Sequence, residues 1–86
     1  MQITIISPER SIFDGPATSV TAPAYDGDVG ILPKHAAFMT LLGKGTLTVK
    51  DGDATRSFKV DGGFLQVLND VIHVVAEHAE GDADAT

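Results

Sequence analysis

The sequence contains no cysteine and no tryptophan, and it has a single tyrosine. The lack of cysteine excludes disulfide bonds, thiolate nucleophiles and cysteine zinc sites, and it is typical of a reducing compartment, so we expect a cytoplasmic location. No apolar run approaches the ~18 residues of a membrane span, and residues 1–9 lack the basic start of a signal peptide. We therefore expect a soluble protein that does not insert directly into lipid.

Basic residues are also few, with six Lys and Arg against twelve Asp and Glu, for a net charge of −6. Four of the acids lie in the last ten residues, which leaves eight acids and six bases, a net −2, for residues 1–76. No cluster of Lys and Arg is present to neutralise phosphates, so we do not expect a nucleic-acid partner. The small, polar and acidic residues 81–86 predict a flexible tail behind a domain of residues 1–80.

The length of 86 residues allows one domain with one hydrophobic core. A chain of this size buries only roughly 60% of its surface on folding, so the core is thin. We expect the domain to be marginally stable as an isolated monomer and to gain stability from a partner.

Asp-Gly pairs are the strongest local signal, at residues 14–15, 26–27, 51–52 and 61–62. Asp-Gly suits turns with positive φ, because Gly has no Cβ and Asp can bond its own backbone. At residues 61–63 the pattern predicts a turn that requires the geometry of Gly62 and Gly63. Four such turns indicate many short strands.

Nine strands are predicted by apolar runs and by alternation of polar and apolar residues, and no segment shows a helical stripe. The clearest pair is a hairpin of residues 46–50 and 57–61, with Leu47 and Val49 facing Phe58 and Val60. The fold class is therefore all-β, a two-sheet sandwich or flattened barrel of about nine to ten strands. The predicted strands are residues 2–7, 11–14, 18–22, 28–31, 38–42, 46–50, 57–61, 63–68 and 71–76.

Two strands depart from simple alternation, because residues 63–68 and 71–75 carry large apolar side chains on both faces. A two-layer sandwich buries only one face of each sheet. Either the strand ends curl into the core, or a partner covers the outer face, and we favour the partner because extended apolar surface is uncommon on a small monomer.

Three segments carry motifs of one known family: residues 26–36, DGDVGILPKHA, residues 61–67, DGGFLQV, and residues 6–15, ISPERSIFDG. They resemble, in that order, the EGDLGILPGHAP loop, the SGGFLEV strand and the VSPEREVFSG start of the ATP synthase epsilon subunit family. The resemblance covers residues 2–80 in order and with matching spacing, which is far more specific than one short motif.

The resemblance implies a rotor subunit of an F-type ATP synthase rather than an enzyme. In that family this domain is a β-sandwich in the central stalk, bound to the gamma subunit and to the polar loops of the membrane c-ring. It lies on the cytoplasmic side of the energy-transducing membrane and helps to couple proton-driven rotation to ATP synthesis at other subunits. Members usually continue into two C-terminal helices, and without them we do not carry over inhibition or nucleotide binding.

The segment from Asp26 to His35 indicates a stiff contact loop. Gly27 and Gly30 permit positive φ or close backbone approach, and Pro33 fixes φ. Ile31 and Leu32 can pin the loop to the core.

By the resemblance, four residues of this loop contact the c-ring: Asp26, Asp28, Lys34 and His35. A carboxylate at residue 28 can pair with a ring Arg or Lys, although Asp also favours turns by its own chemistry. Lys34 stands where the family commonly has Gly, which changes the local charge. The gamma contact is predicted at Met39, Thr40 and Leu41, and alternation leaves open whether residues 39 and 41 or residues 38, 40 and 42 face it.

No pattern predicts a catalytic, cofactor or metal site. The Asp26 loop fails as a calcium loop, because its fifth and twelfth positions are Gly30 and Ala37. No nucleophile elbow or phosphate loop is present. The alternatives are a carrier domain, for which Lys34 and Lys44 lack the required neighbours, and a small-molecule binding barrel, which an apolar cavity would favour.

Overall fold

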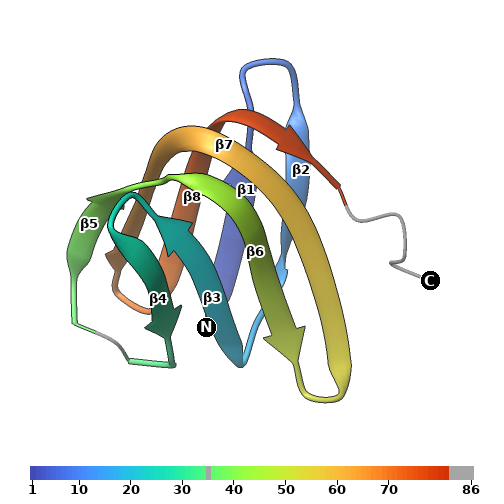
Figure 1. The fold of residues 1–86 in the computed structure, drawn as a ribbon. Coiled ribbons are helices and arrows are strands. Elements are labelled where there is room, and N and C mark those ends of the chain that lie inside the picture. The colour runs from blue at the N-terminus through green and yellow to red at the C-terminus, as the bar shows by residue number, and fades with distance from the viewer. Residues whose placement is uncertain (35, 82–86) are drawn as a thin grey trace.

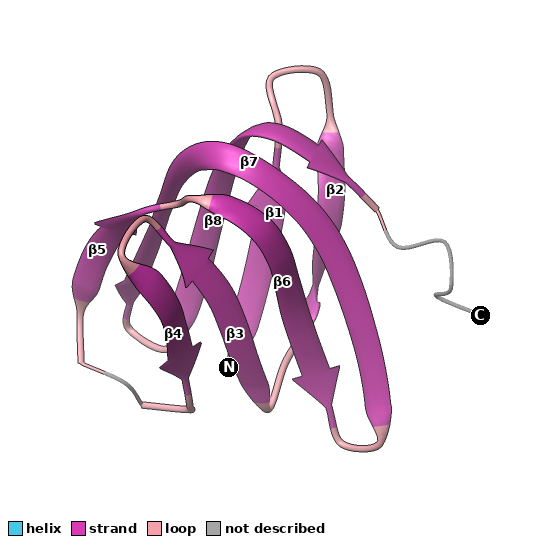
Figure 2. Cartoon of the chain, viewed as in Figure 1, coloured by secondary structure: helices cyan, strands magenta, loops and turns pink. Residues whose placement is uncertain are grey.

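The computed structural model describes residues 1–34 and 36–81, and within those ranges it contains eight strands and no helix (Figures 1 and 2). The predicted all-β fold is confirmed. The predicted tail lies outside the described residues except for Gly81. The strands are β1 Gln2–Ile6, β2 Ser11–Pro16, β3 Ser19–Ala24, β4 Gly27–Ile31, β5 Phe38–Leu41, β6 Lys44–Asp51, β7 Ala54–Leu68 and β8 Val71–Glu80.

The strands form one hydrogen-bonded sheet in the order β2-β1-β8-β7-β6-β3-β4, and β5 pairs with β7 beside this path. Among the eight described strands, β1 and β8 pair in parallel and all other pairs are antiparallel. The long strands arch over the interior in Figure 1, so two parts of the sheet face one another as the layers of a sandwich. One layer contains β1, β2, β5, the first part of β8 and the second half of β7; the other contains β3, β4, β6 and the first half of β7.

The β6–β7 hairpin forms where the sequence predicts it. Asp51 pairs with Ala54 across a two-residue turn, and Gly52 has a φ of 62°, which Gly adopts without a steric penalty. Leu47 pairs with Phe58, and both are buried. The predicted inner face of this hairpin is confirmed.

The predicted turn at residues 61–63 is wrong, because these residues lie inside β7. Gly62 and Gly63 have φ values of 78° and 110°, so the glycine geometry is present without a chain reversal. Residues of β7 up to Asp61 pair with β6, and residues of β7 from Phe64 onward pair with β5. The Gly-Gly pair is a bend that carries one strand from layer to layer, and two of the nine predicted strands are therefore one.

The core lies between the layers and contains no buried polar or charged residue among those described. Phe13 on β2 and Phe58 on β7 join the layers, with ring centroids 5.4 Å apart, and the Arg56 guanidinium lies 5.4 Å above the Phe13 ring. The buried core residues are Ile3, Ile5, Ala17, Val20, Ala22, Ile31, Leu42, Leu47, Val49, Phe58, Val60, Leu65, Val67, Ile72, Val74 and Ala76.

Candidate functional site

The register of β5, β7, β8 and β1 aligns their side chains in rows that alternate between the core and the outer surface. One inward row contains Leu65, Val74 and Ile5, which are all fully buried. Thr40 lies in the same row and is half-buried. The neighbouring rows must therefore point away from the core.

The outward rows carry large apolar side chains. One row contains Leu41, Phe64, Val75 and Ile6 in direct cross-strand register, and the next contains Met39 with the polar residues Gln66, His73 and Thr4. A third outward row contains Leu68 and Val71. We define the outer apolar face by seven residues: Ile6, Met39, Leu41, Phe64, Leu68, Val71 and Val75.

Met39 and Leu41 are the most exposed members of the outer apolar face, at 61% and 60%. Thr40 points the other way, so Met39 and Leu41 are the residues of β5 that lie on the outer surface. Phe64 and Val75 were not predicted as contact residues. The sequence did contain an indication of their exposure, since both belong to the segments with apolar side chains on both faces.

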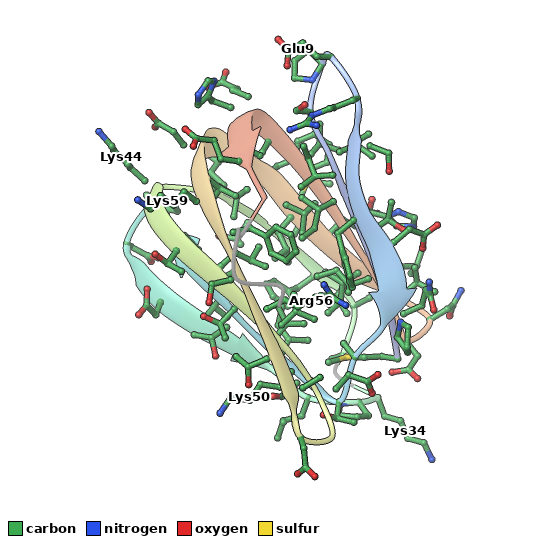
Figure 3. All side chains as sticks on the ribbon, turned by 90° about the vertical axis from the view of Figure 1, so that its right-hand side faces the viewer. Glu9, Lys34, Lys44, Lys50, Arg56 and Lys59 are labelled. Carbon is green, nitrogen blue, oxygen red and sulfur yellow. The ribbon has the colours of Figure 1, made fainter. Side chains whose placement is uncertain are left out.

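The outer surface of the opposite layer is polar. In β6 the outward positions are Lys44, Thr46, Thr48 and Lys50, and in the first half of β7 they are Ser57, Lys59 and Asp61. Figure 3 shows the labelled lysines of this layer pointing away from the ribbon into the surroundings. The two outer surfaces of the sandwich therefore differ sharply in chemistry, and one of them has the composition of an interface core.

The predicted contact loop begins at a two-residue turn that is closed by the pairing of Ala24 with Gly27. Asp26 and Asp28 are both exposed, so their carboxylates are available to a partner. Gly27 has a φ of 130°, as predicted. The expectation for Gly30 is wrong, since its φ is not positive and an added Cβ would meet open space.

Ile31 anchors this loop, because its side chain is only 1% exposed. The prediction that Leu32 also pins the loop is wrong, since it is 63% exposed. Strand alternation explains the difference, because consecutive side chains point to opposite sides. Pro33 and Lys34 are exposed, and His35 lies outside the described residues.

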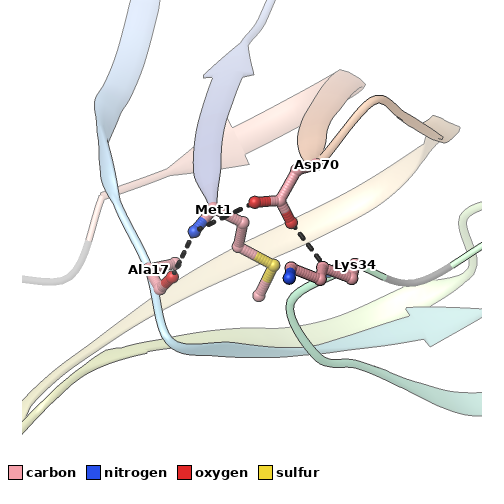
Figure 4. Close-up of polar contacts among 4 residues, drawn as sticks. All are labelled: Met1, Ala17, Lys34 and Asp70. Carbon is pink, nitrogen blue, oxygen red and sulfur yellow. Dashed lines mark hydrogen bonds and ion pairs between the residues drawn. The ribbon is translucent and has the colours of Figure 1, made fainter.

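Lys34 is held at its backbone by a distant turn (Figure 4). Its N–H donates to Oδ1 of Asp70 at 2.8 Å, and Oδ2 of Asp70 lies 3.7 Å from the amino group of Met1. That amino group also donates to the Ala17 carbonyl oxygen at 3.2 Å. The Asp70 carboxylate therefore connects the loop to the body of the domain, a contact that the sequence did not reveal.

A shallow hollow of about 380 Å³ joins the loop to the outer apolar face. It is lined by Tyr25 and Asp26 on one side and by Met39 and Leu41 on the other. The backbone N–H of Tyr25 donates to the Leu41 carbonyl oxygen at 3.0 Å, so the two regions are fixed relative to each other. One partner surface could contact both.

Residues 1–34 and 36–81 contain no group of three or more His, Asp or Glu residues able to hold a metal ion, and no helix long and apolar enough to cross a membrane. Lys44 is the first residue of β6 and Lys34 lies in the loop before β5, so neither occupies the tip of a tight hairpin, where a carrier lysine is displayed.

The comparisons with known proteins agree on one family. The model of the family described as the ATP synthase delta/epsilon chain β-sandwich domain matches residues 1–82. An ATP synthase epsilon chain of Caulobacter vibrioides is 43% identical over 79 residues, which cover 92% of each chain. One of Hydrogenovibrio crunogenus is 44% identical over 92% of this chain but only 55% of the relative, so the chain spans about half of that protein.

A solved structure shows the same fold. A chain of the Euglena gracilis mitochondrial ATP synthase superposes with a TM-score of 0.84 at 23% identity, over 92% of this chain and 51% of that chain. The described fold is thus one that occurs in ATP synthase assemblies.

Proposed function

Because the chain belongs to the ATP synthase delta/epsilon family, whose β-sandwich domain it matches over residues 1–82, we propose that it is a non-catalytic rotor subunit. Membership confirms the resemblance predicted from its loop and strand motifs. In this proposal the domain binds the gamma subunit and contacts the polar loops of the c-ring. It thereby couples proton-driven rotation to ATP synthesis at other subunits, as a peripheral component on the cytoplasmic side of the energy-transducing membrane.

The observation that carries the proposal is the difference between the two outer surfaces. The outer apolar face places Leu41, Phe64, Val75 and Ile6 in one continuous row, whereas the opposite layer presents lysines and threonines. A small domain gains free energy when a partner removes such a row from water, at roughly 25 cal/mol per Å². We assign this face to gamma, with Met39 and Leu41 as the predicted contacts that point outward.

The exposed carboxylates of Asp26 and Asp28 support the second contact. Asp26 lines the hollow that adjoins the outer apolar face, and Asp28 lies two residues further along the same loop. Charged residues are typical of the rim of an interface. We assign them, together with Lys34 and His35 of the same loop, to the c-ring. A carboxylate there can form a charge-assisted hydrogen bond with a basic ring residue.

The construction of the sandwich suits the transmission of torque. β7 belongs to both layers, and the interior is packed with aliphatic side chains. Interiors packed to crystal-like density have low compressibility and transmit strain. A load applied at the loop would thus reach the outer apolar face with little deformation.

The test is an add-back experiment with an ATP synthase assembled without this chain, in membrane vesicles. We expect the incomplete enzyme to hydrolyse ATP with little proton uptake, and added chain to restore the ratio of uptake to hydrolysis and to co-purify with gamma. Well-folded chain that neither binds gamma nor changes this ratio would contradict the proposal and would favour the binding-barrel alternative.

A further inference from the structure

Three non-glycine residues with positive φ lie at or next to a single hydrogen bond. Among the described residues they are Lys34, Asn69 and Asp70, with φ values of 66°, 53° and 65°. Such conformations cost energy for residues with a Cβ and persist where the surroundings impose them. Here the Lys34 N–H donates to Oδ1 of Asp70 at 2.8 Å, so the strained residues lie on both sides of a single hydrogen bond.

The turn that carries Asp70 is short. Leu68 pairs with Val71, so Asn69 and Asp70 form a two-residue hairpin loop, and two successive positive φ values define a type I′ turn. Gly is the favoured residue at the second position of this turn. An Asp at that position is more strained than a Gly would be, which indicates that its side chain has a role beyond forming the turn.

The carboxylate of Asp70 reaches an exposed part of the segment between Ile31 and Phe38. Ile31 is buried at the start of the segment and Phe38 begins β5 at its end, while Leu32, Pro33 and Lys34 between them are exposed. Figure 4 shows the Asp70 side chain lying between Lys34 and Met1. The hydrogen bond thus ties an exposed segment to a turn 36 residues away in the chain.

We propose that Asp70 is a positioning residue, which holds the loop at Lys34 in the orientation in which it meets its partner. The proposal rests on the proposed function, since it assumes that this loop contacts the c-ring. A carboxylate that accepts a backbone N–H makes a charge-assisted bond, which is stronger than a neutral one. It fixes the loop without occupying the carboxylates of Asp26 and Asp28, which remain exposed.

The experiment compares Asp70→Gly with Asp70→Asn in the complete ATP synthase. Glycine suits the turn but removes the acceptor, whereas the asparagine side-chain oxygen can accept the same hydrogen bond. We expect Asp70→Gly to remain folded at the assay temperature, because the more relaxed turn offsets part of the loss of the Lys34 hydrogen bond and the Met1 ion pair, yet to lower the ratio of proton uptake to ATP hydrolysis severalfold. Asp70→Asn should retain more than half of the wild-type ratio, because it keeps the acceptor.

Hydrogen exchange in the same complexes reports the contact itself. In peptides that contain Lys34, we expect its amide to exchange roughly tenfold faster or more in Asp70→Gly, as expected for the loss of a hydrogen bond to a charged group. Asp70→Asn should exchange close to the wild-type rate. A purely structural role for Asp70 predicts no loss of coupling in a variant that melts normally.

Asp28→Lys separates failure of this inference from failure of the proposed function. If Asp28→Lys lowers the ratio and Asp70→Gly does not, the loop contacts its partner without the tether, and the positioning role is overturned alone. If neither variant changes the ratio, both proposals fail. The positioning role is also overturned if Asp70→Asn is as damaging as Asp70→Gly, or if Asp70→Gly lowers the ratio only because it is unfolded at the assay temperature.

Discussion

The truncation of Leu41 to alanine tests the outer apolar face. Leu41 is 60% exposed, so about that fraction of its side chain remains to be buried by a partner. Full burial of a leucine side chain contributes about 1.5 to 3 kcal/mol, and 60% of this range gives about 1 to 2 kcal/mol. We therefore expect Leu41→Ala to weaken binding to gamma by roughly 5-fold to 30-fold.

The assay is calorimetric titration of gamma with the wild-type and variant chains, accompanied by thermal melts of each chain. Because most of the Leu41 side chain is outside the core, the melting temperature should fall by less than about 5 °C. Lys59→Ala on the polar layer is the matched control, and it should change the affinity less than about 2-fold.

Two results would refute the reasoning. The first is equal binding by Leu41→Ala and Lys59→Ala, which would mean that the apolar row is not the contact. The second is a melting temperature so much lower for Leu41→Ala that lost folding accounts for the lost binding.

Three further changes have expected outcomes. Gly63→Ala should destabilise the fold by about 3 kcal/mol or more, which lowers the melting temperature by about 12 °C or more, because φ is positive and the new Cβ would collide with the backbone of β8. In Gly62→Ala the new Cβ meets only the flexible end of the Glu77 side chain, so this variant should melt at a higher temperature than Gly63→Ala. Asp28→Lys should leave the melting temperature within about 3 °C but reduce ATP-driven proton uptake, since this side chain is exposed; equal loss of stability and coupling would argue against a contact role. Arg56→Ala should lower the free energy of unfolding in urea by about 0.5 to 1 kcal/mol through loss of its contact with Phe13. An unchanged urea midpoint of unfolding would show that this contact does not stabilise the fold.

The sequence predicted local features of the fold well. The hairpin around Gly52 follows from strict alternation on both sides of an Asp-Gly turn, and both signals are local. The same Asp-Gly signal at Gly62 predicted a reversal that does not occur. An Asp-Gly pair indicates only that the backbone can adopt positive φ at that point. A bend inside a long strand needs positive φ just as a turn does.

The candidate site was predicted only in part, because its geometry is non-local. The exposure of Met39 and Leu41 depends on their register with β7, and alternation alone gave two equivalent choices. The row through Val75 and Ile6 requires the parallel pairing of β1 with β8, which joins the two ends of the chain. The bond from Lys34 to Asp70 has no sequence signal, since Asn-Asp reads simply as a turn.

The central claim is that the outer apolar face meets gamma while the polar layer stays in water. Oxidative footprinting and lysine acetylation of the chain, alone and in complex with gamma, test this most directly. We expect Met39, Leu41 and Phe64 to become protected from oxidation in the complex, whereas Lys44 and Lys59 should be acetylated at unchanged rates. Protection of those two lysines with unchanged oxidation of Met39 and Leu41 would contradict it.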